Sequence, residues 1–113
     1  QVIAVTAVDR RGGIYRRAIQ GPHIDIAAPG VEIWTAASVS GARTKTGTSF
    51  AAPFVTASVA LLLQGNPSLR PSEVREILTS SARDLGPQGR DDTFGHGLVT
   101  PGDPCLSPAA PQL

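Results

Sequence analysis

The sequence contains no methionine, and no charged and apolar leader of the secretory kind precedes its first structured segment. It begins at Gln1 and enters an apolar, strand-like segment at once, over residues 2–8. We therefore expect a fragment or a mature piece of a longer product. Cysteine is nearly as scarce, since Cys105 is the only one. It either pairs with a cysteine outside this sequence or remains an exposed thiol, and both interpretations stay open.

Excess charge and long apolar runs are also missing. The formal net charge is +1, which predicts no nucleic-acid partner. The longest apolar run, residues 54–63, is too short to cross a bilayer, so we expect no membrane partner. Most basic residues are arginines, and four of them gather around one loop, which is typical of a solvated surface and less often of a partner site. These are Arg10, Arg11, Arg16 and Arg17.

The residue composition indicates a globular chain that is rich in turns. Hydrophobic residues make up 41% of the sequence and charged residues 17%, and there are 12 glycines and 10 prolines. A length of 113 residues allows one domain at most, with a modest core.

Strand-like segments fill the first part of the chain. Residues 2–8 are almost continuously apolar and β-branched, as in a central strand covered on both faces. One short strand is expected around Ile24 and Ile26, ending at Pro29-Gly30, and another from Val31 to about Trp34. A polar loop over residues 38–46 follows. A last short strand is expected over residues 97–100.

Two helices are expected in the second part. The first runs from about Ser49, with Pro53 in or just beyond its first turn, and Gly65 ends it. It has no consistent polar face, which predicts a buried helix at the centre of the core. The second begins at Pro71 with Glu73 in its first turn, and its apolar stripe consists of Val74, Ile77 and Leu78. Strands that alternate with helices indicate an α/β architecture.

The candidate catalytic residue lies at the start of the first helix. Residues 46–53 read Thr-Gly-Thr-Ser-Phe-Ala-Ala-Pro, and Ser49 lies where backbone N–H groups have no helical partner. A hydroxyl in that place suits attack on a carbonyl, because the same N–H groups stabilise the oxyanion that forms. The alternative is an ordinary serine cap, the common role of a lone serine before a helix.

The pattern Gly47-Thr48-Ser49-x-Ala51-x-Pro53 resembles the nucleophile motif of the subtilisin-like serine proteases. Residues 2–9, 24–30, 66–67 and 95–99 resemble segments of that family in the right order, so that the resemblance covers about residues 2–100. Phe54 stands where many members carry histidine, and Ala52 where serine is common. We interpret both as packing variants that do not touch the nucleophile.

The resemblance implies a partial three-layer α/β fold with a mostly parallel sheet and a central buried helix. Residues 1–100 would be the C-terminal half of the peptidase domain, and residues 101–113 a Pro-rich tail or linker. It further implies Ser49 as the nucleophile for peptide-bond hydrolysis through an acyl-enzyme. Gly47 would allow close approach of the substrate backbone, and Thr48 would lie near the oxyanion or be purely structural.

The family places its catalytic aspartate and histidine far upstream of the serine, so the resemblance implies that both lie outside this sequence. The same holds for the asparagine that completes the oxyanion hole. His23 and His96 match no catalytic motif, and Asp25 alternates with apolar neighbours like a hydrogen-bonding residue near a strand edge. Because a serine needs a base to become nucleophilic, we expect the isolated chain to be inactive.

Other functions are less well supported by the residues. In residues 41–47, Thr44 stands before Lys45 where a phosphate-binding loop needs glycine, and Ala51 stands where an esterase elbow needs glycine. No cofactor is implied, and Asp91-Asp92 are too few for a calcium site. The remaining alternative is a non-catalytic structural or interaction module that forms a homodimer through the apolar edge of residues 2–8.

The expected partners are a protein or peptide substrate and the upstream remainder of the peptidase domain. The expected location is secreted, periplasmic or in the cell envelope.

Overall fold

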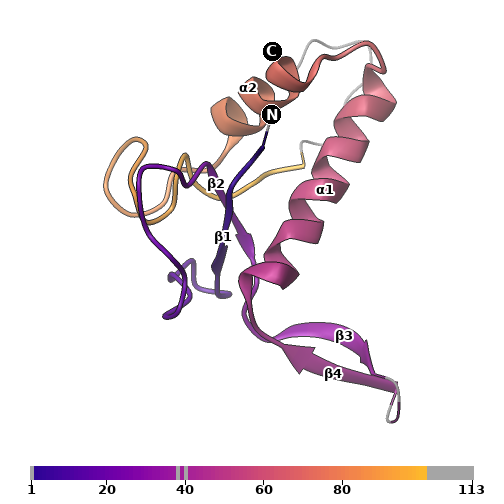
Figure 1. The fold of residues 1–113 in the computed structure, drawn as a ribbon, viewed down its shortest axis with the longest axis vertical. Helices are drawn as coiled ribbons and strands as arrows, with labels where there is room; N and C mark the ends of the chain where they lie inside the picture. The colour runs from indigo at the N-terminus through magenta and orange to yellow at the C-terminus, as the bar shows by residue number, and fades with distance from the viewer. Residues whose placement is uncertain (1, 38, 40, 102–113) are drawn as a thin grey trace.

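The computed structural model describes residues 2–37, 39 and 41–101, so Cys105 and the tail after residue 101 lie outside the described residues. Figure 1 shows the longer helix lying along a central pair of strands, a hairpin projecting from its start and a second helix near its other end. In chain order the elements are β1 (Val5–Val8), β2 (Ile26–Pro29), β3 (Ile33–Ala37), β4 (Gly41–Lys45), α1 (Thr48–Gly65) and α2 (Pro71–Ser81). The α/β expectation is confirmed, as two helices with small sheets.

β1 and β2 form a parallel pair, with Val5 opposite Ile26. On the other side of β2, the Ala27 amide donates to the Gly97 carbonyl at 2.8 Å, so the strand expected over residues 97–100 is a short bridge beside β2. On the other side of β1, the Tyr15 amide donates to the Ala7 carbonyl at 2.8 Å. The apolar edge that the sequence predicts is therefore already covered near its carboxyl end.

The core lies between this sheet and the two helices. Its buried members all come from the predicted strands and helices, because alternating strand residues and every third or fourth helix residue point inward. They are Ala7, Ile26, Ala28, Ala51, Val55, Val74, Leu78 and Val99. α2 begins at Pro71 and buries the predicted stripe of Val74, Ile77 and Leu78, which confirms the amphipathic helix.

α1 begins and ends close to the predicted residues, but the prediction that it is buried all round is wrong for this chain. Only Ala51, Val55 and Ser58 are buried, while Phe54 is 41% exposed and Leu61 50% exposed. An apolar helix needs cover on every side to be buried, and the described residues supply a sheet on one side only. By length and composition alone, this uncharged 18-residue helix would also suit a membrane span.

The polar loop expected before Ser49 is instead a β-strand. β3 and β4 pair antiparallel, with Trp34 opposite Thr44 and Ala37 opposite Gly41. The Thr35 hydroxyl donates to the Arg43 carbonyl at 3.2 Å. Most of β4 is exposed, so this hairpin has no buried face that would impose alternation of polar and apolar residues on the sequence.

Candidate functional site

Three segments meet where β1 and β2 end. The Gly30 amide donates to the Val8 carbonyl at 3.0 Å, and the Gly47 amide donates to the Gly30 carbonyl at 2.8 Å. The Thr46 hydroxyl accepts a 2.9 Å hydrogen bond from the Glu32 amide. The segment before α1 is thus fixed to the carboxyl end of β2, and this is the edge at which open parallel sheets bind ligands.

Ser49 is the second residue of α1 and is exposed at this edge. Among the described residues, the amides of Thr48 and Ser49 have no hydrogen-bond acceptor, whereas the Phe50 amide donates to the Gly47 carbonyl at 3.0 Å. Ser49 is therefore an exposed residue in the first turn of an 18-residue helix, where two N–H donors have no acceptor among the described residues, at the positive end of the helix dipole. This arrangement can hold an anion or stabilise an oxyanion.

The ordinary serine cap is not what the structure shows. Gly47 occupies the N-cap position, with φ 156° and ψ 160°, and α1 has no side-chain capping bond. That backbone region is almost restricted to glycine, which explains why glycine precedes the helix. Thr48 is half-buried in the first turn, next to Ser49.

Gly30 is a residue that the sequence did not single out for the site. A Cβ atom at Gly30 would lie 2.5 Å from the Ala7 side chain and 2.8 Å from the Gly47 carbonyl oxygen. Only a residue without a side chain lets β1, β2 and the start of α1 approach so closely. The signal in the sequence is the pair Pro29-Gly30, which by itself predicts only the end of a strand.

Both histidines lie at the opposite end of β2 from Ser49. The His96 amide donates to the Asp25 carbonyl at 2.8 Å, and His23 precedes this strand. The strand rise of about 3.3 Å per residue puts Asp25 roughly 16 Å from Gly30, where Ser49 is anchored. Neither histidine is therefore placed to take a proton from the Ser49 hydroxyl.

Asp25 has the hydrogen-bonding role that the sequence predicts. Its residue exposure is 9%, one carboxylate oxygen accepts from the Ala4 amide at 2.8 Å, and the other pairs with the Arg75 guanidinium. Because both oxygens are occupied, this carboxylate holds the amino end of the sheet to α2.

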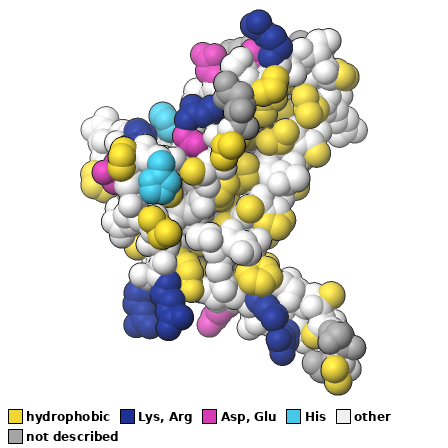
Figure 2. All heavy atoms as spheres, in the orientation of Figure 1, with side chains coloured by type: hydrophobic (Ala, Val, Ile, Leu, Met, Phe, Trp, Pro, Cys, Tyr) yellow, Lys and Arg dark blue, Asp and Glu magenta, His cyan; other side chains and the backbone are white. Residues whose placement is uncertain are grey.

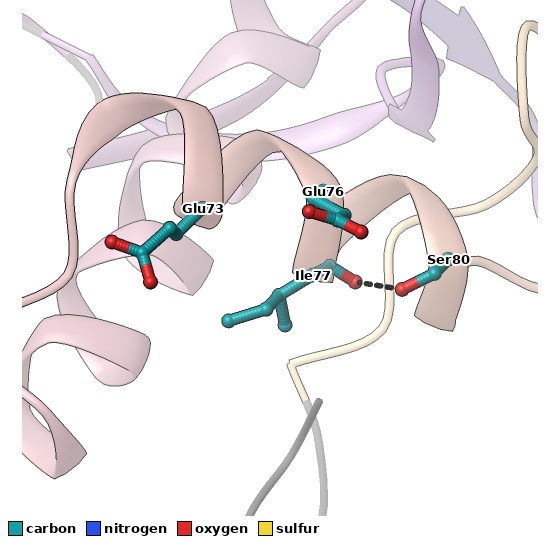
Figure 3. Close-up of a pocket in the computed structure, with 4 residues that line it drawn as sticks. All are labelled: Glu73, Glu76, Ile77 and Ser80. Atoms are coloured by element: carbon teal, nitrogen blue, oxygen red, sulfur yellow. Dashed lines mark hydrogen bonds between the residues drawn. The ribbon is translucent and has the colours of Figure 1, made fainter.

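The pocket on α2 does not coincide with Ser49. This hollow of about 170 Å³ is lined by Glu73, Glu76, Ile77 and Ser80. Figure 3 shows the Ser80 hydroxyl directed to the Ile77 carbonyl, a 3.3 Å hydrogen bond within the helix. The pocket offers two carboxylates and no nucleophile with a base beside it. Among the described residues, no group of histidine, cysteine and carboxylate side chains is arranged to hold a metal.

Sequence comparison identifies the family to which this architecture belongs. A profile of the Subtilase family (Peptidase_S8) matches residues 1–97. The chain belongs to the subtilase family. Minor extracellular protease Epr of Bacillus subtilis (strain 168) is 34% identical over 98 residues, and Subtilisin DY of Bacillus licheniformis is 36% identical over 100 residues. Each alignment covers 87% of this chain.

Solved subtilase structures confirm the fold. MycP1 from Mycobacterium smegmatis matches 88% of this subtilase chain with a TM-score of 0.78 and 28% sequence identity. The chain spans only part of its relatives: 15% of Epr, 35% of Subtilisin DY and 28% of that MycP1 chain. It is thus a subtilase segment homologous to part of the subtilisin-like serine protease domain.

Proposed function

We propose that this chain is the C-terminal half of the catalytic domain of a serine endopeptidase, with Ser49 as the acyl-accepting nucleophile. One observation carries the proposal: Ser49 is exposed in the first turn of α1, where the amides of Thr48 and Ser49 have no acceptor among the described residues. The family membership supports peptide-bond hydrolysis as the reaction.

In this proposal each site residue has a role in acyl transfer. The Ser49 oxygen attacks the carbonyl carbon of the scissile bond while its proton passes to a base, and the oxygen of that carbonyl becomes negatively charged. The Ser49 amide and the positive end of α1 stabilise this charge. When this intermediate collapses, the C–N bond breaks, the amine leaves with the proton from the base, and the acyl group stays on Ser49. The extended Gly47 backbone leaves room for the substrate main chain, and Thr48 supports the first turn.

The base comes from another part of the peptidase domain, because both histidines of this chain lie at the wrong end of β2. In subtilisin, loss of the serine or of the histidine is known to lower turnover by about 10⁶-fold. The isolated chain should therefore hydrolyse peptides no faster than its Ser49→Ala variant.

The partners and location follow from this proposal. The substrate is a protein or peptide, and the remainder of the peptidase domain packs against the exposed side of α1, which accounts for an apolar helix with one buried face. The extracellular relative Epr supports a secreted, periplasmic or cell-envelope location.

Active-site labelling tests the proposal. A fluorescent fluorophosphonate should label Ser49 in the full-length protein, and the Ser49→Ala variant should remain unlabelled. Ser68→Ala, an exposed serine in the loop after α1, should label like the unaltered protein. The isolated chain should react slowly. An unlabelled full-length protein would contradict the nucleophile, and rapid labelling of the isolated chain would contradict the need for an external base.

A second candidate is a non-catalytic interaction module, which the exposed apolar side chains favour. Val2 is 85% exposed and Trp34 is 69% exposed, in addition to Phe54 and Leu61 on α1. Such surfaces promote association with a second copy or another chain. A stable monomer in sedimentation at high concentration would argue against homodimerisation, and a catalytic aspartate and histidine in the upstream sequence would favour the protease.

A further inference from the structure

Basic and acidic residues are unevenly distributed over the molecule. The segments near the carboxyl ends of β1 and β2, residues 9–17, 30–37 and 41–49, contain six basic and two acidic residues, a formal charge of +4. The other described residues contain four basic and six acidic residues, a formal charge of −2. We call the first set the basic edge: Arg10, Arg11, Arg16, Arg17, Arg43 and Lys45. Although the net charge of the chain is small, positive charge is concentrated in the segments near the carboxyl ends of β1 and β2.

The side chains of the basic edge are available for a partner. None of the six forms an ion pair or a side-chain hydrogen bond with another described residue. Elsewhere in the described chain, three of the four arginines are paired with carboxylates: Arg70 with Glu73, Arg75 with Asp25 and Arg90 with Asp92. Five of the six are exposed, and Lys45 is half-buried.

The carboxylate in the loop after β1, that of Asp9, is occupied by the backbone. Asp9 Oδ1 accepts from the Arg11 amide at 2.8 Å and from the Gly13 amide at 2.9 Å. The Asp9 amide also donates to the Gly13 carbonyl at 2.9 Å, which closes the loop. Asp9 thus holds the backbone that presents Arg10 and Arg11, and it does not pair with their guanidinium groups.

The basic edge lies at the same end of the sheet as Ser49. Figure 2 shows two groups of Lys and Arg side chains at the lower end of the molecule, one below the loop after β1 and one along the hairpin. In the matching view of Figure 1, the start of α1 lies between these two places. The hydrogen bonds from Gly30 to Val8 and from Gly47 to Gly30 link the three segments directly.

We infer that the basic edge is a docking surface for an acidic segment of the polypeptide substrate, one rich in aspartate and glutamate. This inference rests on the proposed function, because the polypeptide that binds the basic edge is the same substrate that Ser49 would attack. Unpaired guanidinium groups bind carboxylates in bidentate geometry, and a positive field beside a cleft raises the rate of encounter with acidic chains. The surface selects substrates by charge and takes no part in the chemistry.

Binding of two matched peptides tests the inference without requiring hydrolysis. The protein is the full-length Ser49→Ala variant, and the fluorescent probes are identical peptides with glutamates or glutamines at the same positions. Fluorescence anisotropy should show about tenfold tighter binding of the glutamate peptide, since each exposed ion pair changes affinity roughly two- to fivefold. Raising the salt from about 0.05 M to about 0.5 M should remove most of the difference.

Charge reversals locate the binding surface. Arg17→Glu should weaken binding of the glutamate peptide about fivefold and leave the glutamine peptide unchanged. Arg83→Glu makes the same change of net charge at an exposed arginine outside the basic edge and should leave both affinities unchanged. Thermal melting of each variant verifies that it is folded.

Three outcomes would overturn the inference: equal affinity for the two peptides, equal effects of Arg17→Glu and Arg83→Glu, or tighter binding of a DNA duplex than of the glutamate peptide. Fluorophosphonate labelling of the protein with Ser49 intact reports the proposed function separately. A labelled protein without charge preference would therefore refute docking alone, and an unlabelled protein that prefers the acidic peptide would refute catalysis alone.

Discussion

The amide of Gly47 donates a 2.8 Å hydrogen bond to the carbonyl of Gly30, and this contact joins the start of α1 to the end of β2. The two glycines meet because neither carries a side chain at a crowded crossing of three segments. The position of Ser49 relative to the sheet depends on this crossing.

Gly30→Ala adds only one methyl group, but it should lower the stability of the chain and displace the start of α1, which carries Ser49. The added methyl group would lie 2.5 Å from the Ala7 side chain and 2.8 Å from the Gly47 carbonyl oxygen, so the backbone has to move. We expect a loss of about 1–3 kcal/mol in the free energy of unfolding, measured with urea, and slower labelling of Ser49 in the full-length protein. Gly65→Ala is the control, because a Cβ there meets nothing within 4 Å and alanine favours a helix. A Gly30→Ala variant as stable as this control would contradict the close approach.

The one-sided burial of α1 predicts unequal effects of neighbouring truncations. Val55 is 4% exposed and Phe54 is 41% exposed, although they are consecutive residues of one helix. Val55→Ala should cost about 1–3 kcal/mol in the free energy of unfolding of this chain, because it removes core contacts. Phe54→Ala should cost less in this chain and more in the full-length protein, where we propose that its face is covered. Equal costs in the isolated chain would contradict the one-sided packing.

The pair of Asp25 and Arg75 joins two residues 50 positions apart. Asp25→Asn keeps the shape of the side chain but removes the charge, and we expect a loss of about 1–3 kcal/mol in urea unfolding. The matched control is Asp92→Asn, since the side chain of Asp92 is 59% exposed and its pair with Arg90 is solvated. That change should cost at most about 1 kcal/mol. An Asp92→Asn variant less stable than Asp25→Asn would reverse the ranking and count against the stabilising role of the partly buried pair of Asp25 and Arg75.

The first turn of α2 contributes stability that depends on pH. Hydrogen bonds from the Arg70 side chain (Nε, 2.9 Å) and from its backbone amide (3.1 Å) lower the pKa of Glu73 below its ordinary value. A carboxyl group whose pKa is lowered by folding stabilises the folded state above its ordinary pKa, and this contribution disappears as the pH falls through the lowered pKa. The melting temperature of Glu73→Gln should therefore lie below that of the unaltered chain near neutral pH and approach it in acid.

The difference in melting temperature should be small because the side chain of Arg70 is largely exposed and that of Glu73 is partly exposed. Glu76→Gln is the control on the same helix and should not show this dependence on pH. A difference between the Glu73→Gln variant and the unaltered chain that grows towards low pH would have the wrong sign and would contradict the lowered pKa.

Local residue patterns were sufficient to predict both helices. The run from Ser49 to Gly65 and the stripe of Val74, Ile77 and Leu78 are features of neighbouring residues, and the structure follows them closely. The hairpin of β3 and β4 was not predicted beyond its first strand. A strand that is exposed on both faces carries no period-two pattern, so only its backbone pairing identifies it.

The sequence by itself determined where α1 begins and ends and where α2 begins, and it placed Ser49 in the first turn of an apolar helix, because capping and periodicity act over a few residues. Only the tertiary structure decided which face of α1 is buried, which carboxylate Arg75 meets and that the arginines after β1 share an edge with Ser49. Those relationships join residues far apart along the chain. They depend on how β1 and β2 pair, and no local pattern contains that information.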